Sequence, residues 1–150
     1  DDSRCSPREI QNYLGRISGP LLDRIDLHIE VPTVPFDKIS GMEAGESSEQ
    51  IRQRVISARN IQLRRFAQSK AIMCNANMSS RALKVCCQLD EASLDLMKHA
   101  MAHVGLSARA YDRILKVART IADLAQQEHI HSDHVMEAIQ FRELDRQIWI

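Results

Sequence analysis

One arginine in the N-terminal part of the chain is placed where it could meet a phosphate group. Arg24 lies in segment 18–28, which reads SGPLLDRIDLH, after a Gly-Pro turn and just before an alternating run of apolar and polar residues. A guanidinium group stays charged and presents a planar fork of N–H donors that matches phosphate oxygens. The same residues also fit a plainer role, a local ion pair of Arg24 with Asp23 or Asp26. The residue types alone leave both roles open.

A second group of arginines lies on a helix predicted over residues 48–70. Between residues 47 and 70 the chain carries six basic side chains and one acidic one. Such a helix either contacts nucleic-acid phosphates or a neighbouring subunit, or forms a solvated surface whose charges pair with nearby elements. With Phe66 as its one aromatic residue, backbone contact is favoured over base stacking. The candidate contacts are Arg52, Arg59, Arg64 and Arg65.

Two kinds of site are missing from the sequence pattern. No G-x-x-x-x-G-K-[ST] loop occurs, and no apolar strand ends in paired acids that would hold magnesium. We therefore expect the isolated chain to bind no cofactor and to be inactive as an ATPase. His129, His131 and His134 cross a predicted junction of loop and helix without a clear further ligand for a tetrahedral site, so no metal site is predicted.

The elements that must position these side chains are mainly helical. A capping box at Ser6 and Glu9 begins the first helix, and residues 26–31 alternate with the period of a strand. Further helices are predicted at 48–70, 79–88, 90–103, 107–127 and from residue 132 onward.

The single predicted strand suggests how the chain is organised. A lone strand is unstable without neighbours, so residues 1–44 are interpreted as a helix, turn and strand left from an α/β domain whose sheet lies upstream, with a polar linker at 41–48. Residues 45–150 are predicted to form a small helical bundle. The fold class is thus mainly α.

Composition narrows the function classes. The 150 residues include 20 Lys and Arg and 20 Asp and Glu, for a formal net charge of zero. This balance argues against a free-standing DNA-binding module, which usually carries excess positive charge, although the arginine-rich helix keeps that alternative open. No apolar run is long enough to cross a bilayer, and the four cysteines show no disulfide spacing, so we expect a cytoplasmic protein.

Three motifs, in order, resemble one known family. SPREIQNY at 6–13 with SGPLLDRIDLH at 18–28, GLSARAY at 105–111 with ARTIADL at 118–124, and HVMEAIQFR at 134–142 are similar to the magnesium-chelatase-like AAA+ ATPases, in the ComM competence-protein branch. The resemblance covers essentially the whole chain. It implies that residues 45–150 are the helical lid domain and residues 1–44 the end of the AAA+ core.

The resemblance also assigns roles to particular residues. Arg24 corresponds to the arginine finger, which acts in trans on the ATP of the neighbouring subunit. Arg109 corresponds to the second sensor arginine, with Arg113 and Arg119 on the same helix as alternatives. Cys5 matches the second cysteine of the family's Cys-x-Cys pair, but the first is absent here, so no metal role is assigned to it.

The implied function belongs to the intact protein. It would be a homo-hexameric ring that uses ATP and Mg²⁺ to drive a branch-migration helicase on DNA during competence and recombination. The alternatives are a chelatase-type ATPase that inserts a metal or remodels a protein and, from another class, an independent helical DNA-binding or interaction module.

Overall fold

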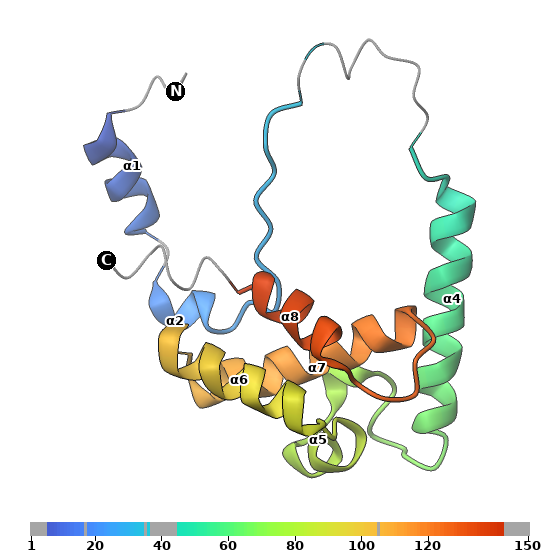
Figure 1. Cartoon of the computed structure of the whole chain (residues 1–150). Coiled ribbons are helices and arrows are strands. Elements are labelled where there is room, and N and C mark those ends of the chain that lie inside the picture. Colours follow the sequence, from blue (N-terminus) through green and yellow to red (C-terminus); the bar gives the residue numbers. More distant parts are fainter. Residues whose placement is uncertain (1–5, 17, 35, 37–44, 105, 143–150) are drawn as a thin grey trace.

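The computed structural model describes residues 6–16, 18–34, 36, 45–104 and 106–142, and the regular secondary structure of these residues is helical (Figure 1). The predicted mainly α fold is therefore confirmed. The helices are α1 (Pro7–Leu14), α2 (Gly19–Leu22), α4 (Ser48–Arg65), the 3₁₀ helix η1 (Asn75–Asn77), α5 (Ser80–Cys86), α6 (Glu91–Val104), α7 (Ala108–Leu124) and α8 (Ser132–Gln140).

Side-chain caps begin several of these helices where the sequence predicts them. The hydroxyl oxygens of Ser47, Ser79 and Ser107 accept hydrogen bonds from backbone N–H groups in the first turns of α4, α5 and α7. At α4 the cap is a full capping box, because the Gln50 side chain also accepts from the Ser47 backbone. These bonds satisfy N–H groups that have no partner within a helix.

Helix α7 is the centre of the bundle. Its residues Ala110, Ile114, Ala118 and Ala122 are almost completely buried, and the small alanines let neighbouring helices approach closely. Helix α8 packs along α7, while α4, α5 and η1 pack on other parts of it. Helix α6 packs against α8. The core is completed by side chains from these helices and the residues that directly follow them, including Phe66, Met78, Leu83, Met97 and Val135.

Helix α4 is only partly covered. Figure 1 shows it upright at one side of the bundle, with its N-terminal half reaching beyond the other helices. Ala58 and Gln62 are buried, whereas the apolar side chains of Ile51 and Val55 are exposed. The helix also ends at Arg65 rather than residue 70, because the chain turns after Phe66 toward η1.

The prediction of a strand at residues 26–31 is wrong. Residues 27–34 have no strand assignment, and the described residues contain a single isolated β-bridge, between Leu89 and Ile130. A strand forms only against a neighbouring strand, and the described part of the chain offers none to this segment. The His28 N–H instead donates to the Phe141 carbonyl at the end of α8, at 2.8 Å.

Candidate functional site

Arg24 lies on the turn that follows α2. Its backbone N–H donates to the Leu21 carbonyl at 3.0 Å, which closes the turn, and its side chain is exposed. Among the described residues the Arg24 guanidinium has no hydrogen bond or ion pair. The local pairing that the sequence left open is therefore not what the structure contains, and the guanidinium can meet a group from outside the chain.

The acid that precedes Arg24 is bound to the N-terminus of α7. Ser107 donates its hydroxyl proton to an Asp23 carboxylate oxygen at 2.7 Å, and Arg109 Nη1 lies 3.4 Å from the other oxygen. The Ser107 hydroxyl oxygen in turn accepts from Ala110 N, so Asp23 contacts the residue that caps the helix. The hydrogen bond from Ser107, and secondarily the charge of Arg109, lower the pKa of Asp23 below its usual value.

The acid that follows Arg24 is bound one turn further along α7. Arg113 donates to the Asp26 carboxylate, and the spacing of four residues places Arg109 and Arg113 on one face of the helix. Arg113 is the more shielded of the two, with 24% of its side chain exposed against 66% for Arg109. The two arginines predicted to sense nucleotide thus both contact the segment that carries Arg24.

The end of α8 completes the attachment of this segment. Buried Arg142 donates to the Ile25 carbonyl, and the Phe141 carbonyl accepts the His28 N–H. We refer to the contacts of Asp23, Ile25, Asp26 and His28 with α7 and α8 as the clasp. Sequence reasoning missed it, although acids on both sides of Arg24 and basic residues four apart on α7 are a signal for such paired contacts.

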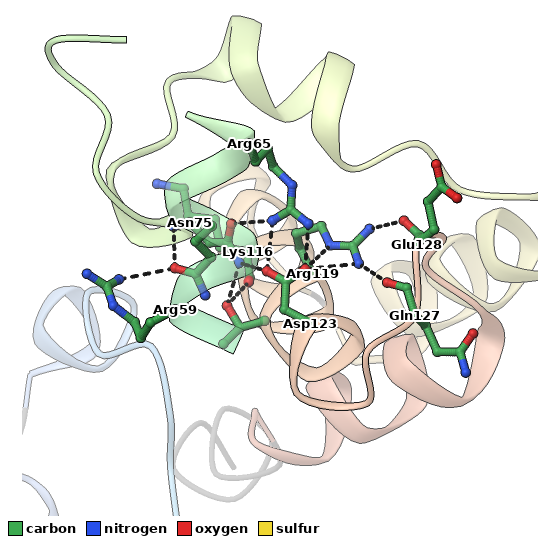
Figure 2. A network of polar contacts seen from close by, with 10 residues as sticks. Arg59, Arg65, Asn75, Lys116, Arg119, Asp123, Gln127 and Glu128 are labelled. Atoms are coloured by element: carbon green, nitrogen blue, oxygen red, sulfur yellow. Dashed lines mark hydrogen bonds and ion pairs between the residues drawn. The ribbon is translucent and has the colours of Figure 1, made fainter. Parts of the chain in front are cut away.

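A polar network fills the space between α4, η1 and α7 (Figure 2). Asp123 has a fully buried carboxylate, which accepts two bonds from Arg65 at 2.5 and 2.7 Å and one from Arg119 Nε at 3.1 Å. Asn75 donates to the same carboxylate at 2.8 Å. Arg119 also donates to the carbonyls of Gln127 and Glu128, which lie in the turn between α7 and α8.

This network changes the role that the sequence predicted for two arginines. The side chain of Arg65 is 19% exposed and that of Arg119 is 4% exposed. Their donors are used inside the fold, so Arg65 differs from the other α4 arginines predicted to contact DNA or a subunit. Arg119 likewise serves the fold and is no alternative to Arg109 as a sensor.

The other arginines of α4 remain on its surface. Arg52 lies 3.8 Å from Glu49, a long contact between exposed groups, and Arg59 donates to Gln62 at 3.2 Å. Arg64 is exposed, and its side chain makes no hydrogen bond or ion pair with a described residue. Their predicted contacts with DNA or a neighbouring subunit stay a prediction.

No group of three His, Cys, Asp or Glu side chains in the described ranges could hold a metal ion. In the histidine-rich turn, His131 lies 3.8 Å from Asp90, and the His134 ring accepts the His131 backbone N–H, a local capping arrangement. Cys5 lies outside the described residues. Within the part of the chain that the structure covers, no helix has the length and apolar character needed to cross a membrane.

Comparison with known proteins identifies the class. The C-terminal family model of magnesium chelatase subunit ChlI matches residues 45–142, and the ChlI model matches residues 1–39. The helical bundle and the segment clasped to it therefore fall under two parts of one protein family. The chain belongs to the magnesium-chelatase-like family and corresponds to the C-terminal part of an AAA+-type protein.

Among individual proteins, the chain is similar to the competence protein ComM of Haemophilus influenzae, with 41% identity over 145 residues. The protein YifB of Escherichia coli has the same identity over the same length, and a Mycobacterium tuberculosis protein, Rv2897c, is 34% identical over 142 residues. Each match covers at least 95% of this chain but 28% of the relative. The chain thus spans less than a third of the length of these relatives.

Proposed function

We propose that this chain is the C-terminal part of a ring-forming AAA+ ATPase, in which Arg24 acts as an arginine finger on ATP bound by the neighbouring subunit. The observation that carries the proposal is the exposed Arg24 guanidinium, unpaired among the described residues although an acid lies on either side of it. A weak local ion pair with Asp23 or Asp26 is the plainer role that the sequence left open for Arg24. Here both acids contact α7 instead, which leaves Arg24 available to a phosphate.

The intact protein would supply the rest of the catalytic site. The sequence contains neither a phosphate-binding loop nor paired acids for Mg²⁺, so the proposal requires both to lie outside this chain, which spans 28% of the relatives' length. Arg109 is the proposed sensor of bound nucleotide, since its side chain is mostly exposed at the start of α7, where a helix favours phosphate. Arg113, one turn further along α7, is paired with Asp26 and mostly shielded, so it is given no part in the proposed nucleotide site.

The proposed work of the ring is remodelling of DNA, with branch migration as the specific activity. Two observations support this choice: the relation to a competence protein, and the exposed arginines of α4, which suit contact with the phosphate backbone. A chelatase-type role in metal insertion or protein remodelling is the second candidate. It is favoured by the family description itself, which names magnesium chelatase.

The first experiment measures ATP hydrolysis by the full-length protein, with and without branched DNA. An arginine finger contributes about 10³–10⁵ in rate, so Arg24→Ala should reduce turnover by about that factor while the ring still assembles in gel filtration. Arg16→Ala, which removes another exposed arginine of the N-terminal segment, is the matched control and should keep turnover normal. Normal turnover by an assembled Arg24→Ala ring would refute the assignment.

Mixed rings test whether Arg24 acts across the subunit interface. Arg24→Ala subunits keep their own phosphate-binding loop, and subunits with an inactivated loop keep Arg24. If the finger acts in trans, mixing the two inactive proteins restores part of the turnover, because some interfaces combine an intact loop with an intact arginine. A finger that acts within its own subunit would give no recovery. A rate of ATP hydrolysis that is the same with and without DNA would favour the chelatase-type role.

A further inference from the structure

The clasp joins parts of the chain that are far apart in sequence. Asp23 and Ser107 are separated by 84 residues, and Asp26 and Arg113 by 87. The two acids lie one residue before and two residues after Arg24, so both ends of the turn that carries the arginine are fixed to one face of α7. The arginine itself points to no partner among the described residues.

We propose that Asp23 and Asp26 are positioning residues, which tie the arginine-finger turn to the lid helix α7 so that Arg24 moves as α7 moves. The inference rests on the proposed function, because it concerns how the finger of that function is held. Ordering the backbone of a loop costs conformational entropy, so a turn that already has a defined place lowers the cost of presenting Arg24 to a phosphate. Arg109, which would bind the nucleotide, and the turn that carries Arg24 are then both held by helix α7.

The two contacts are not equivalent. Asp23 has a short hydrogen bond to Ser107, but its contact with Arg109 is 3.4 Å long and largely exposed. Arg109 can therefore engage a phosphate while Asp23 stays bound to the helix cap. The Asp26–Arg113 pair is more shielded on the arginine side, and the Asp26 side chain has no other hydrogen bond or ion pair with a described residue. Asp26 is thus the position at which the clasp can be opened without touching the proposed sensor.

The clasp can be tested on this chain without any ATPase activity. The His28 amide reports on it, because it is hydrogen bonded to the Phe141 carbonyl and buried. An exposed ion pair is worth up to about 1 kcal/mol, so Asp26→Asn should speed His28 amide exchange by about threefold to fivefold. Core amides of α7 such as that of Ile114 should be unchanged. The control is Glu30→Gln, which removes an exposed acid nearby that has no described partner.

Turnover of the full-length ring tests the consequence for catalysis. Asp26→Asn should lower kcat for ATP by about tenfold with KM unchanged, since it misplaces the finger without touching the nucleotide site, and Asp26→Glu should restore much of the loss. If His28 exchange is unaffected, the clasp is refuted as a restraint. If Arg24→Ala abolishes turnover but Asp26→Asn leaves kcat unchanged, the positioning role is refuted while the finger stands. If Arg24→Ala is fully active, both the proposed function and this inference fail.

Discussion

Replacement of Asp123 is expected to be the most damaging single substitution in the polar network. The carboxylate is fully buried and accepts bonds from Arg65, Arg119 and Asn75. Asp123→Ala would leave two guanidinium groups without their shared counter-ion in the interior. Breaking a buried ion pair by removing one partner costs about 3–5 kcal/mol, a large share of the roughly 5–15 kcal/mol that stabilises a typical domain.

Urea denaturation of this chain, followed by circular dichroism, measures the effect. With a slope of about 1.5 kcal/mol per molar urea, typical of small proteins, the midpoint should fall by about 2–3 M. Asp112→Asn is the matched control, because Asp112 lies on the same helix and its side chain has no hydrogen bond or ion pair among the described residues. The reasoning is refuted if both variants unfold within about 0.5 M of the wild type, since the carboxylate would then contribute little.

Three further predictions concern single side chains. Burial, together with the neighbouring thiol of Cys86, raises the pKa of Cys87 to about 12, so iodoacetamide at pH 8 should leave Cys87 unmodified in the folded chain and modify it in urea; mass spectrometry reports both states. The pKa of Asp23 is lowered, first by the Ser107 hydrogen bond, so its stabilising contribution is complete above the ordinary value and is lost as the pH falls through the lower folded value. An NMR titration should show that pKa moving back up in Ser107→Ala, and no movement would contradict the bond. Arg24→Ala should change the free energy of unfolding by less than about 0.5 kcal/mol, because the side chain is exposed and unpaired in the described structure; a larger loss in urea denaturation would mean that Arg24 supports the fold.

The sequence predicted the helices of the bundle well because their signals are local. The serines at 47, 79 and 107 cap helices that begin at or one residue from the predicted start, and cap preferences depend on a few neighbouring residues. The end of α4 was predicted less well. No proline or glycine stops the helix there, and the chain leaves it because Phe66 packs into the core and Asn75 must reach Asp123.

The prediction failed where the outcome depends on distant residues. The alternation at 26–31 indicates a strand only if another strand is present, and the described residues supply helix ends instead. Arg64 and Arg65 are chemically identical neighbours, yet one is exposed and the other is bound to a carboxylate 58 residues away. No local pattern distinguishes them, so the sequence could predict a basic helix but not which arginine the fold would use.

In the proposed function, the exposed arginines of α4 would distinguish a DNA substrate from other substrates, whereas Arg24 would concern only the ATP chemistry. An arginine finger held by a lid helix would serve a ring that moves DNA as well as one that remodels a protein or loads a metal, so neither Arg24 nor the clasp separates these functions. DNA contact predicts that replacing Arg52, Arg59 and Arg64 together lowers the salt sensitivity of DNA binding and the DNA stimulation of turnover, with basal turnover intact. Arg65 must be kept, because its loss would break its bond to Asp123 and destabilise the fold. A destabilised variant would bind DNA poorly for a reason unrelated to DNA contact. The partly buried position of Arg65 and its bond to Asp123 therefore determine which arginines such a variant can contain.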